Sequence, residues 1–221
     1  MKLLSQSQNM TKILNTLFVT MIGLGKIPKI PGTFGSLATV ILLYIFFHIL
    51  EFSSNVILIL LIIIFILSFL AIAKHIKYNE NKDPKEIVID EFIGQSIPIY
   101  LYEISHGTEK SPNEALIFYG ICFVLFRFFD IAKPFPVNFF DKNFKNSFGV
   151  IMDDVIAGIY VVISLICFML FRFFDIAKPF PVSFFDKNFK NSFGVIMDDV
   201  IAGFYVVLSL ICFMVLSSYF L

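Results

Sequence analysis

Long apolar segments alternate with short polar segments along this chain of 221 residues. The two clearest apolar segments are 37–50 and 56–73, and the stretch between them is mostly polar. A helix needs roughly 20 apolar residues to cross the hydrocarbon core of a bilayer, so the second segment is long enough and the first is slightly short. We expect these two segments to form a helical hairpin. Further apolar segments follow the same pattern: 13–24, 92–102, 115–126 and 155–171.

Composition supports a membrane protein. Hydrophobic residues make up 58% of the chain, charged residues make up 15%, and the mean hydropathy is +0.86. Lys plus Arg and Asp plus Glu each total 17, so the chain has no net charge to attract a nucleic acid. We therefore predict an all-α, multi-pass helical membrane protein with no nucleic-acid partner.

The C-terminal half contains a block that occurs twice. Residues 121–165 recur as residues 166–210, and the differences are confined to Val124/Met169, Asn138/Ser183, Ile159/Phe204 and Ile163/Leu208. The units of a solenoid diverge more than this, so the pattern indicates a recent duplication inside a single domain. We divide the chain into a domain at residues 1–170 and a duplicated motif block with its helix at residues 171–221.

A loop rich in glycine and proline, GLGKIPKIPGTFGS, occupies residues 23–36 and leads into an apolar segment. Prolines fix φ, glycines allow close backbone approach, and Thr33 or Ser36 can cap the following helix. The loop is either a phosphate cradle with Lys26 or Lys29 beside it, or an ordinary capped loop at the membrane interface. The spacing alone does not separate these two interpretations.

Two adjacent carboxylates, Asp90 and Glu91, enter an apolar segment. We expect Asp83 and Pro84 to begin the helix that carries them, as N-cap and first helical residue. Carboxylates in an apolar segment are unfavourable unless they are paired or bind a cation. The alternative is that both charges are solvated at a helix end.

The repeated block carries its own charged residues. Arg127 and Asp130 are three positions apart and share a helix face, and Lys133 follows them. Asp153 and Asp154 then begin the next apolar helix, with Gly158 one turn later. Taken singly, these residues could form a helix ion pair or an N-cap. Phenylalanines between the charges fit the boundary between water and lipid, which favours a lipid substrate.

Together these residues predict metal-assisted phosphoryl chemistry at a membrane interface. A carboxylate set without His or Cys suits a hard cation such as Mg²⁺, and Arg or Lys beside the ion suits a phosphate. The carboxylates of this set are Asp90, Glu91, Asp130, Asp141, Asp153 and Asp154, and the cationic residues beside them are Arg127 and Lys133. The residues expected to contact the substrate are Lys26, Gly32, Thr33, Gly35, Ser36, Asp141 and Lys142.

Four motifs in order resemble the phosphatidylglycerophosphatase A family: GLGKIPKIPGTFGSL, IVIDEFIGQ, FRFFDIAKPFPV followed by DK, and GVIMDDVIAG. The resemblance implies a Mg²⁺-dependent lipid phosphatase that converts phosphatidylglycerophosphate to phosphatidylglycerol. It also implies a bacterial inner-membrane location with the site facing the cytosol. The resemblance implies that Asp90, Glu91, Asp130, Asp153 and Asp154 are metal and catalytic carboxylates, and that Arg127 and Lys133 contact the phosphate. All seven are therefore expected catalytic residues, and the expected metal ligands among them are Asp90, Glu91, Asp153 and Asp154.

The second copy departs from the family pattern. Its matching residues, which we predict are not required, are Arg172, Asp175, Lys178, Asp198 and Asp199. If the apolar segment between the copies crosses the membrane, the second set lies on the side opposite Asp90 and Glu91. Each copy has balanced charges, so the positive-inside rule does not place one relative to the other. The alternatives are an inactive duplicated pseudoenzyme and a small polytopic transporter or scaffold protein.

Overall fold

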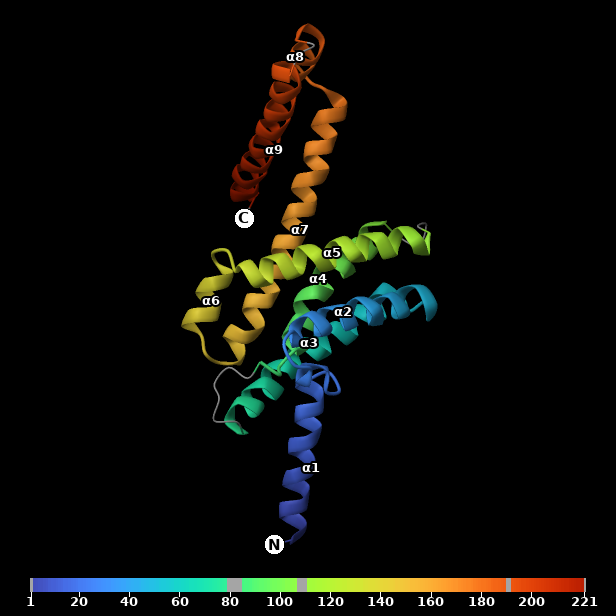
Figure 1. Ribbon diagram of the computed structural model, residues 1–221, viewed down its shortest axis with the longest axis vertical. Helices are drawn as coiled ribbons and strands as arrows, with labels where there is room; N and C mark the ends of the chain where they lie inside the picture. The colour runs from blue at the N-terminus through green and yellow to red at the C-terminus, as the bar shows by residue number, and fades with distance from the viewer. Residues whose placement is uncertain (1, 79–84, 107–110, 190–191, 221) are drawn as a thin grey trace. The chain divides into compact units, whose positions relative to one another are not determined.

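The computed structural model describes residues 2–78, 85–106, 111–189 and 192–220, and none of these lies in a β-strand. In chain order the helices are α1 (Lys2–Val19), η1 (Leu24–Lys26), α2 (Pro31–Tyr44), η2 (Ile45–Ile49), α3 (Ser54–Tyr78), α4 (Ile89–His106), α5 (Pro112–Ala132), α6 (Val137–Asn143), α7 (Ser147–Ala177), α8 (Val182–Asn188) and α9 (Ser192–Phe220). Figure 1 shows these helices. The predicted all-α fold is confirmed.

Five helical segments in the described part of the chain are long and apolar enough to cross a membrane: Pro31–Ile49, Ser54–Lys77, Pro112–Ala132, Ser147–Ala177 and Ser192–Cys212. The first of them starts earlier than the apolar pattern suggested. Pro31 is the first helical residue of α2, where a proline loses no helical hydrogen bond. The first helix of the expected hairpin is therefore long enough, and the chain is a helical membrane protein. The hairpin itself is not formed as expected, because α2 packs against α4 and α5, and α3 packs against α1 and α4.

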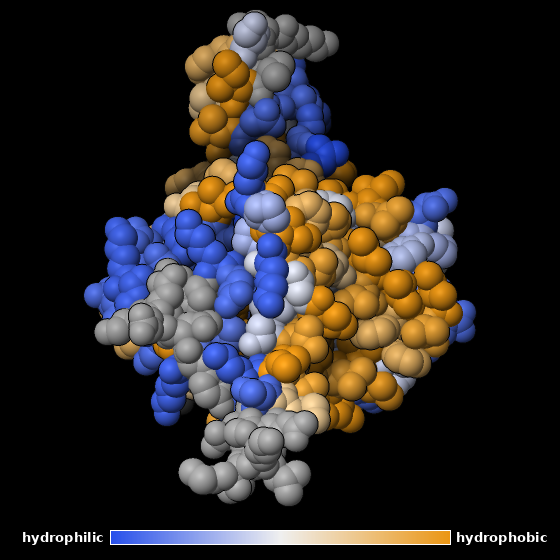
Figure 2. Space-filling view, turned by 60° about the horizontal axis from the view of Figure 1, so that its bottom comes forward, coloured by the Kyte–Doolittle hydropathy of each residue, from blue (hydrophilic) through white to orange (hydrophobic). Residues whose placement is uncertain are grey.

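Large apolar side chains are exposed along the helices, as lipid contact requires. On α3 they include Leu58, Ile59, Leu60, Ile62, Ile63, Ile66, Leu67 and Leu70. Figure 2 shows a broad area of such side chains beside an area of hydrophilic ones. In water this much exposed apolar surface would be unfavourable, and in a bilayer it is the surface that meets lipid.

The chain forms two compact units, residues 1–162 and residues 163–221, and the boundary falls within α7. In the first unit α4 packs against α2, α3 and α5, and α1 packs against α3. Much of α4 is buried, including Phe92, Ile93 and Ile99. In the second unit α8 packs against α9. The residues 121–162 of the first copy thus belong to a packed helical unit around α4.

The chain enters α4 differently from our expectation. Asp83 and Pro84 lie outside the described residues, and the helix begins at Ile89. The preceding residues are not helical, and the N–H of Val88 donates to the carbonyl of Val19 at 2.9 Å. Ile89, Ile87 and Val19 belong to one buried cluster with Ile151 of α7. This packing places the first turn of α4, with its two carboxylates, beside the first half of α7.

Candidate active site

Two glycines let α4 and α7 cross in close contact. A Cβ atom added at Gly158 would meet the carbonyl oxygen of Gly94, and one added at Gly94 would meet the carbonyl oxygen of Asp154. Neither position can hold a side chain unless the backbone moves. Because residues four apart share a helix face, this crossing brings Asp90 and Glu91, on the preceding turn of α4, toward Asp154.

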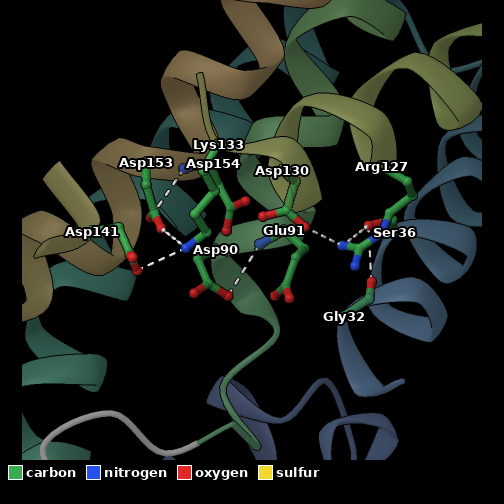
Figure 3. Close-up of polar contacts among 10 residues, drawn as sticks. All are labelled: Gly32, Ser36, Asp90, Glu91, Arg127, Asp130, Lys133, Asp141, Asp153 and Asp154. Carbon is green, nitrogen blue, oxygen red and sulfur yellow. Dashed lines mark hydrogen bonds and ion pairs between the residues drawn. The ribbon is translucent and has the colours of Figure 1, made fainter. Parts of the chain in front are cut away.

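Three carboxylates meet at this crossing. Asp90, Glu91 and Asp154 each offer one oxygen atom, and the three atoms all lie within 4.8 Å of one another. Figure 3 shows these side chains next to Asp130 and Arg127. Oε2 of Glu91 and Oδ1 of Asp154 are enclosed and have no hydrogen-bond partner among the described residues. We call these three residues the carboxylate trio.

The electrostatics of the trio favour a bound cation. Burial raises the pKa of the Asp90 carboxyl above its usual value. Burial also raises the pKa of Glu91 well above its usual value, and the charge of Asp90 adds to that effect. Three negative charges at this spacing repel strongly unless a proton or a cation neutralises them. The donors are all carboxylate oxygens, so the residues present fit Mg²⁺.

Arg127 lies beside the trio at the end of α5. Its Nη1 is 2.5 Å from Oδ2 of Asp130, so the expected pair on one helix face is formed. The same nitrogen donates to Oγ of Ser36 at 3.5 Å, and that hydroxyl donates to the carbonyl of Gly32 at 2.9 Å. Nε of Arg127 is enclosed without a partner in the described part of the chain. The guanidinium group is therefore oriented by α2 and α5 and keeps a free donor.

Lys133 connects the loop after α5 to α7. Its Nζ donates to Asp141 at 2.7 Å and to Asp153 at 3.1 Å. Burial alone would lower the pKa of the Lys133 ammonium group, but the two carboxylates outweigh this effect and raise the pKa. Asp153, which we expected to be a metal ligand, is thus directed to Lys133, whereas Asp154 joins the trio.

The loop before α2 approaches the trio through its backbone. A Cβ atom at Gly32 would meet Oε1 of Glu91, so glycine allows the carboxylate to lie against the helix start. Gly35 has another role, because a Cβ there would lie 2.9 Å from Cβ of Val88. Glycine at that position lets α2 pack on the residue before α4. The first turns of α2 therefore pack closely against Glu91 and against Val88.

A cavity of about 380 Å³ joins these side chains. The predicted residues that line it are Gly32, Thr33, Asp90, Glu91, Arg127, Asp130, Lys133, Asp141, Asp153 and Asp154. The predicted residues that do not line it are Lys26, Gly35, Ser36 and Lys142. Lysines that line it outside our predicted set are Lys29, Lys85 and Lys145. Lys29 lies inside the glycine- and proline-rich loop and was considered there as an alternative to Lys26, whereas Lys85 and Lys145 lie outside the recognised motifs, where a lysine in a polar loop is usually only solvated.

The second copy repeats the local ion pairs without the trio. Arg172 pairs with Asp175 at 2.7 Å, and Lys178 lies 2.6 Å from Asp186 and 3.9 Å from Asp198. Asp199, the counterpart of Asp154, is exposed. The duplicated block does not contain a second Asp90 or Glu91.

A Cβ atom added at Gly203, the counterpart of Gly158, would meet nothing within 4 Å in the described structure. Local sequence therefore reproduces the pairs within the block, while the trio needs α4.

Comparison with known proteins gives consistent matches. The family model for phosphatidylglycerophosphatase A matches residues 17–167 and again residues 161–214. A Haemophilus influenzae protein named phosphatidylglycerophosphatase A is 37% identical over 153 residues, which cover 68% of this chain and 87% of that protein. The Escherichia coli protein of the same name is 30% identical over 137 residues, or 62% of this chain and 73% of that protein.

A Bacteroides thetaiotaomicron protein named "Putative phosphatidylinositol-3-phosphatase" is 34% identical over 154 residues, which cover 69% of this chain and 91% of that protein. No solved structure matches the chain. The first family match covers the whole carboxylate trio, and the second covers the duplicated block. On these grounds the chain belongs to the phosphatidylglycerophosphatase A family and is a phosphatase.

Proposed function

We propose that this protein hydrolyses phosphatidylglycerophosphate to phosphatidylglycerol and phosphate with the help of Mg²⁺. The observation that carries the proposal is the carboxylate trio, whose oxygens lie within 4.8 Å of one another and partly lack hydrogen-bond partners. An Arg and a Lys line the same cavity. Carboxylates for a cation beside basic groups for an anion are what metal-assisted phosphoryl transfer requires.

The names of the relatives support a lipid substrate with two kinds of phosphate. Phosphatidylglycerophosphate and phosphatidylinositol 3-phosphate each carry a terminal phosphomonoester on a head group that a phosphodiester joins to the lipid. Two relatives are named for the first lipid and one for the second. The membrane helices of this chain fit a substrate of that class.

In the proposed reaction, Asp90, Glu91 and Asp154 would hold Mg²⁺, which when bound neutralises phosphoryl charge and activates an oxygen nucleophile. Arg127 is held by Asp130 and keeps its Nε donor free. Its planar guanidinium group can therefore bind two phosphate oxygens.

Lys133 supplies a second positive charge on the α7 side of the cavity. Its contacts with Asp141 and Asp153 fix the position of Nζ. Asp153 would thus act by positioning Lys133.

We further propose that the protein spans a bacterial inner membrane several times with this site facing the cytosol. The helix ends near the site carry many lysines: Lys26, Lys29, Lys74, Lys77, Lys85, Lys133, Lys142 and Lys145. The connection 50–53, at the other end of the helix that starts at Pro31, contains no lysine. Cytoplasmic loops carry an excess of Lys and Arg, so this bias supports the cytosolic side for the site. The named relatives come from bacteria.

The first copy of the repeated block would be the working copy. All three trio residues belong to residues 1–162, which form one compact unit. The trio is therefore complete without any residue of the second copy. This supports an active enzyme over a pseudoenzyme damaged by its duplication.

The test is phosphate release from phosphatidylglycerophosphate by the purified full-length protein in detergent. We expect release that needs Mg²⁺, stops with EDTA and returns when Mg²⁺ is added in excess. Glu91→Gln should lose the activity, because a neutral isostere keeps the shape and loses cation affinity. Glu114→Gln, at an exposed position in the first turn of α5, should retain it. Full activity in EDTA, or no release by the wild type, would contradict the proposal.

A further inference from the structure

Three lysines line the cavity from three different segments. Lys29 lies in the loop before α2, Lys85 precedes α4, and Lys145 lies between α6 and α7. All three residues are exposed. In the described part of the chain, none of them forms an ion pair. We call them the lysine rim.

The rim differs from the inner cations of the same cavity. Arg127 is paired with Asp130, and Lys133 is paired with Asp141 and Asp153. Those two positive charges are therefore largely balanced by protein carboxylates. The rim charges lack such partners, so they remain available to an anion that enters the cavity.

The backbone at Lys29 is held in an unusual conformation. Its φ is +82°, a region that side-chain-bearing residues rarely adopt. Pro28 and Pro31 flank it and restrict the loop. A non-glycine residue is kept at positive φ only where the surrounding structure holds the backbone in place at some energetic cost. The backbone at Lys29 is therefore held in position, and its exposed side chain lines the cavity.

We propose that the lysine rim binds the phosphodiester phosphate of the lipid substrate while the terminal phosphomonoester lies at the carboxylate trio. This inference rests on the proposed function and adds an explanation of how the site selects its lipid substrate. The cavity of about 380 Å³ falls in the range of sites that hold a whole small ligand, so it has room for a head group as well as a phosphate. Lysine binds phosphate as a point charge and tolerates variation in the head group between the two phosphates.

The proposal makes the rim a device for selecting the substrate. Phosphatidic acid has a phosphomonoester and no phosphodiester, and phosphatidylglycerol has a phosphodiester and no phosphomonoester. The rim should therefore strengthen binding of phosphatidylglycerol and of the substrate, and should leave binding of phosphatidic acid unchanged. Binding of these two lipids therefore distinguishes the contribution of the lysine rim from that of the carboxylate trio.

The experiment measures inhibition by each lipid during hydrolysis of phosphatidylglycerophosphate by the full-length protein in uncharged detergent with Mg²⁺. The test variant carries Lys29→Ala, Lys85→Ala and Lys145→Ala. The control variant carries Lys77→Ala and Lys187→Ala, which are exposed lysines that do not line the cavity. Uncharged detergent removes the anionic bilayer surface, so a general attraction of lysines to membranes cannot produce the effect.

An exposed charge pair changes an equilibrium by about threefold, so the test variant should raise the KM for substrate and the inhibition constant of phosphatidylglycerol by roughly thirtyfold. The inhibition constant of phosphatidic acid and the kcat should change by less than about threefold. Arginine at all three positions should restore the wild-type values. High salt should reduce the difference between wild type and test variant, because it screens exposed charges.

If the test variant bound both inhibitors equally more weakly, or left the inhibition constant of phosphatidylglycerol unchanged, the proposed role of the lysine rim would be overturned and the proposed function would stand. The same loss in the control variant would also overturn it. A wild-type protein that hydrolyses no phosphatidylglycerophosphate would overturn the proposed function and, with it, the rim.

Discussion

Replacing Asp154 by Asn tests the carboxylate trio against a control that the chain itself supplies. Asp154 is 4% exposed, and its Oδ1 has no hydrogen-bond partner among the described residues. Asp199 has the same neighbours in sequence, GVIMDDVIAG, but it is exposed in the second unit. Asp154→Asn and Asp199→Asn are therefore the same chemical change in the same local sequence. Asp154 lies beside two carboxylates of α4, and Asp199 is exposed.

The expected effect on stability follows from the spacing of the trio. Two unit charges 4.8 Å apart, the largest separation in the trio, repel by ~3.5 kcal/mol at an effective dielectric constant of 20. Removing one of three charges removes two of three such pairs, which is ~7 kcal/mol when all three groups are ionised and no cation is bound. Burial raises the pKa values of Asp90 and Glu91, so bound protons relieve part of this repulsion. We expect a gain in metal-free stability of about 1–4 kcal/mol.

Thermal unfolding in detergent, with EDTA and with Mg²⁺, measures this gain, and phosphate release measures function. Asp154→Asn should unfold at a higher temperature than wild type in EDTA. It should gain less stability from added Mg²⁺, because a ligand stabilises only the state that binds it. Its activity should fall at least about a hundredfold, since even residues that only support metal ligands contribute 10–100-fold.

Asp199→Asn should match wild type in all three measurements. A lower unfolding temperature of Asp154→Asn in EDTA would show that Asp154 is a structural hydrogen-bond acceptor, and the reasoning from repulsion would fail. Equal loss of activity in both variants would show that the second copy contributes to the site.

Three further predictions concern packing, pH and the repeat. Gly158→Ala should destabilise the protein by about 1–3 kcal/mol in thermal unfolding, because its methyl group meets a backbone carbonyl, while Gly203→Ala should be neutral or stabilising by up to about 1 kcal/mol. The Mg²⁺ concentration that gives half-maximal activity should fall as pH rises through the raised pKa values of Asp90 and Glu91, since protons on these carboxylates compete with the metal; a flat profile would contradict this. Deleting residues 178–221 should leave phosphate release at or near the wild-type rate, and loss of activity in a folded truncated protein would show that the second copy is needed.

The sequence was sufficient for the fold class and for most of the candidate residues. Apolar segments of membrane-spanning length predict helices because a bilayer leaves no other partner for the backbone. The pair of Arg127 and Asp130 also follows from sequence, since three residues along a helix fix their common face. The repeat shows the same point, because both copies form this local pair.

Tertiary structure decided which of these residues act together. Asp153 and Asp154 are adjacent in sequence, yet one contacts Lys133 and the other joins the trio, because successive helical side chains point in different directions. The sequence also placed the start of α4 too early, since residues 85–88 are not helical and Ile87 and Ile89 belong to a buried cluster.

Comparison of the two copies shows which features local sequence determines and which features tertiary packing determines. Their sequences are nearly identical, so local structure and local ion pairs are nearly identical as well. Asp154 is enclosed and Asp199 is exposed because Gly158 lies against Gly94 of α4, and the corresponding glycine of the second copy has no such contact. The repeated block supplies Asp154, and the close approach of α4 places Asp90 and Glu91 beside it.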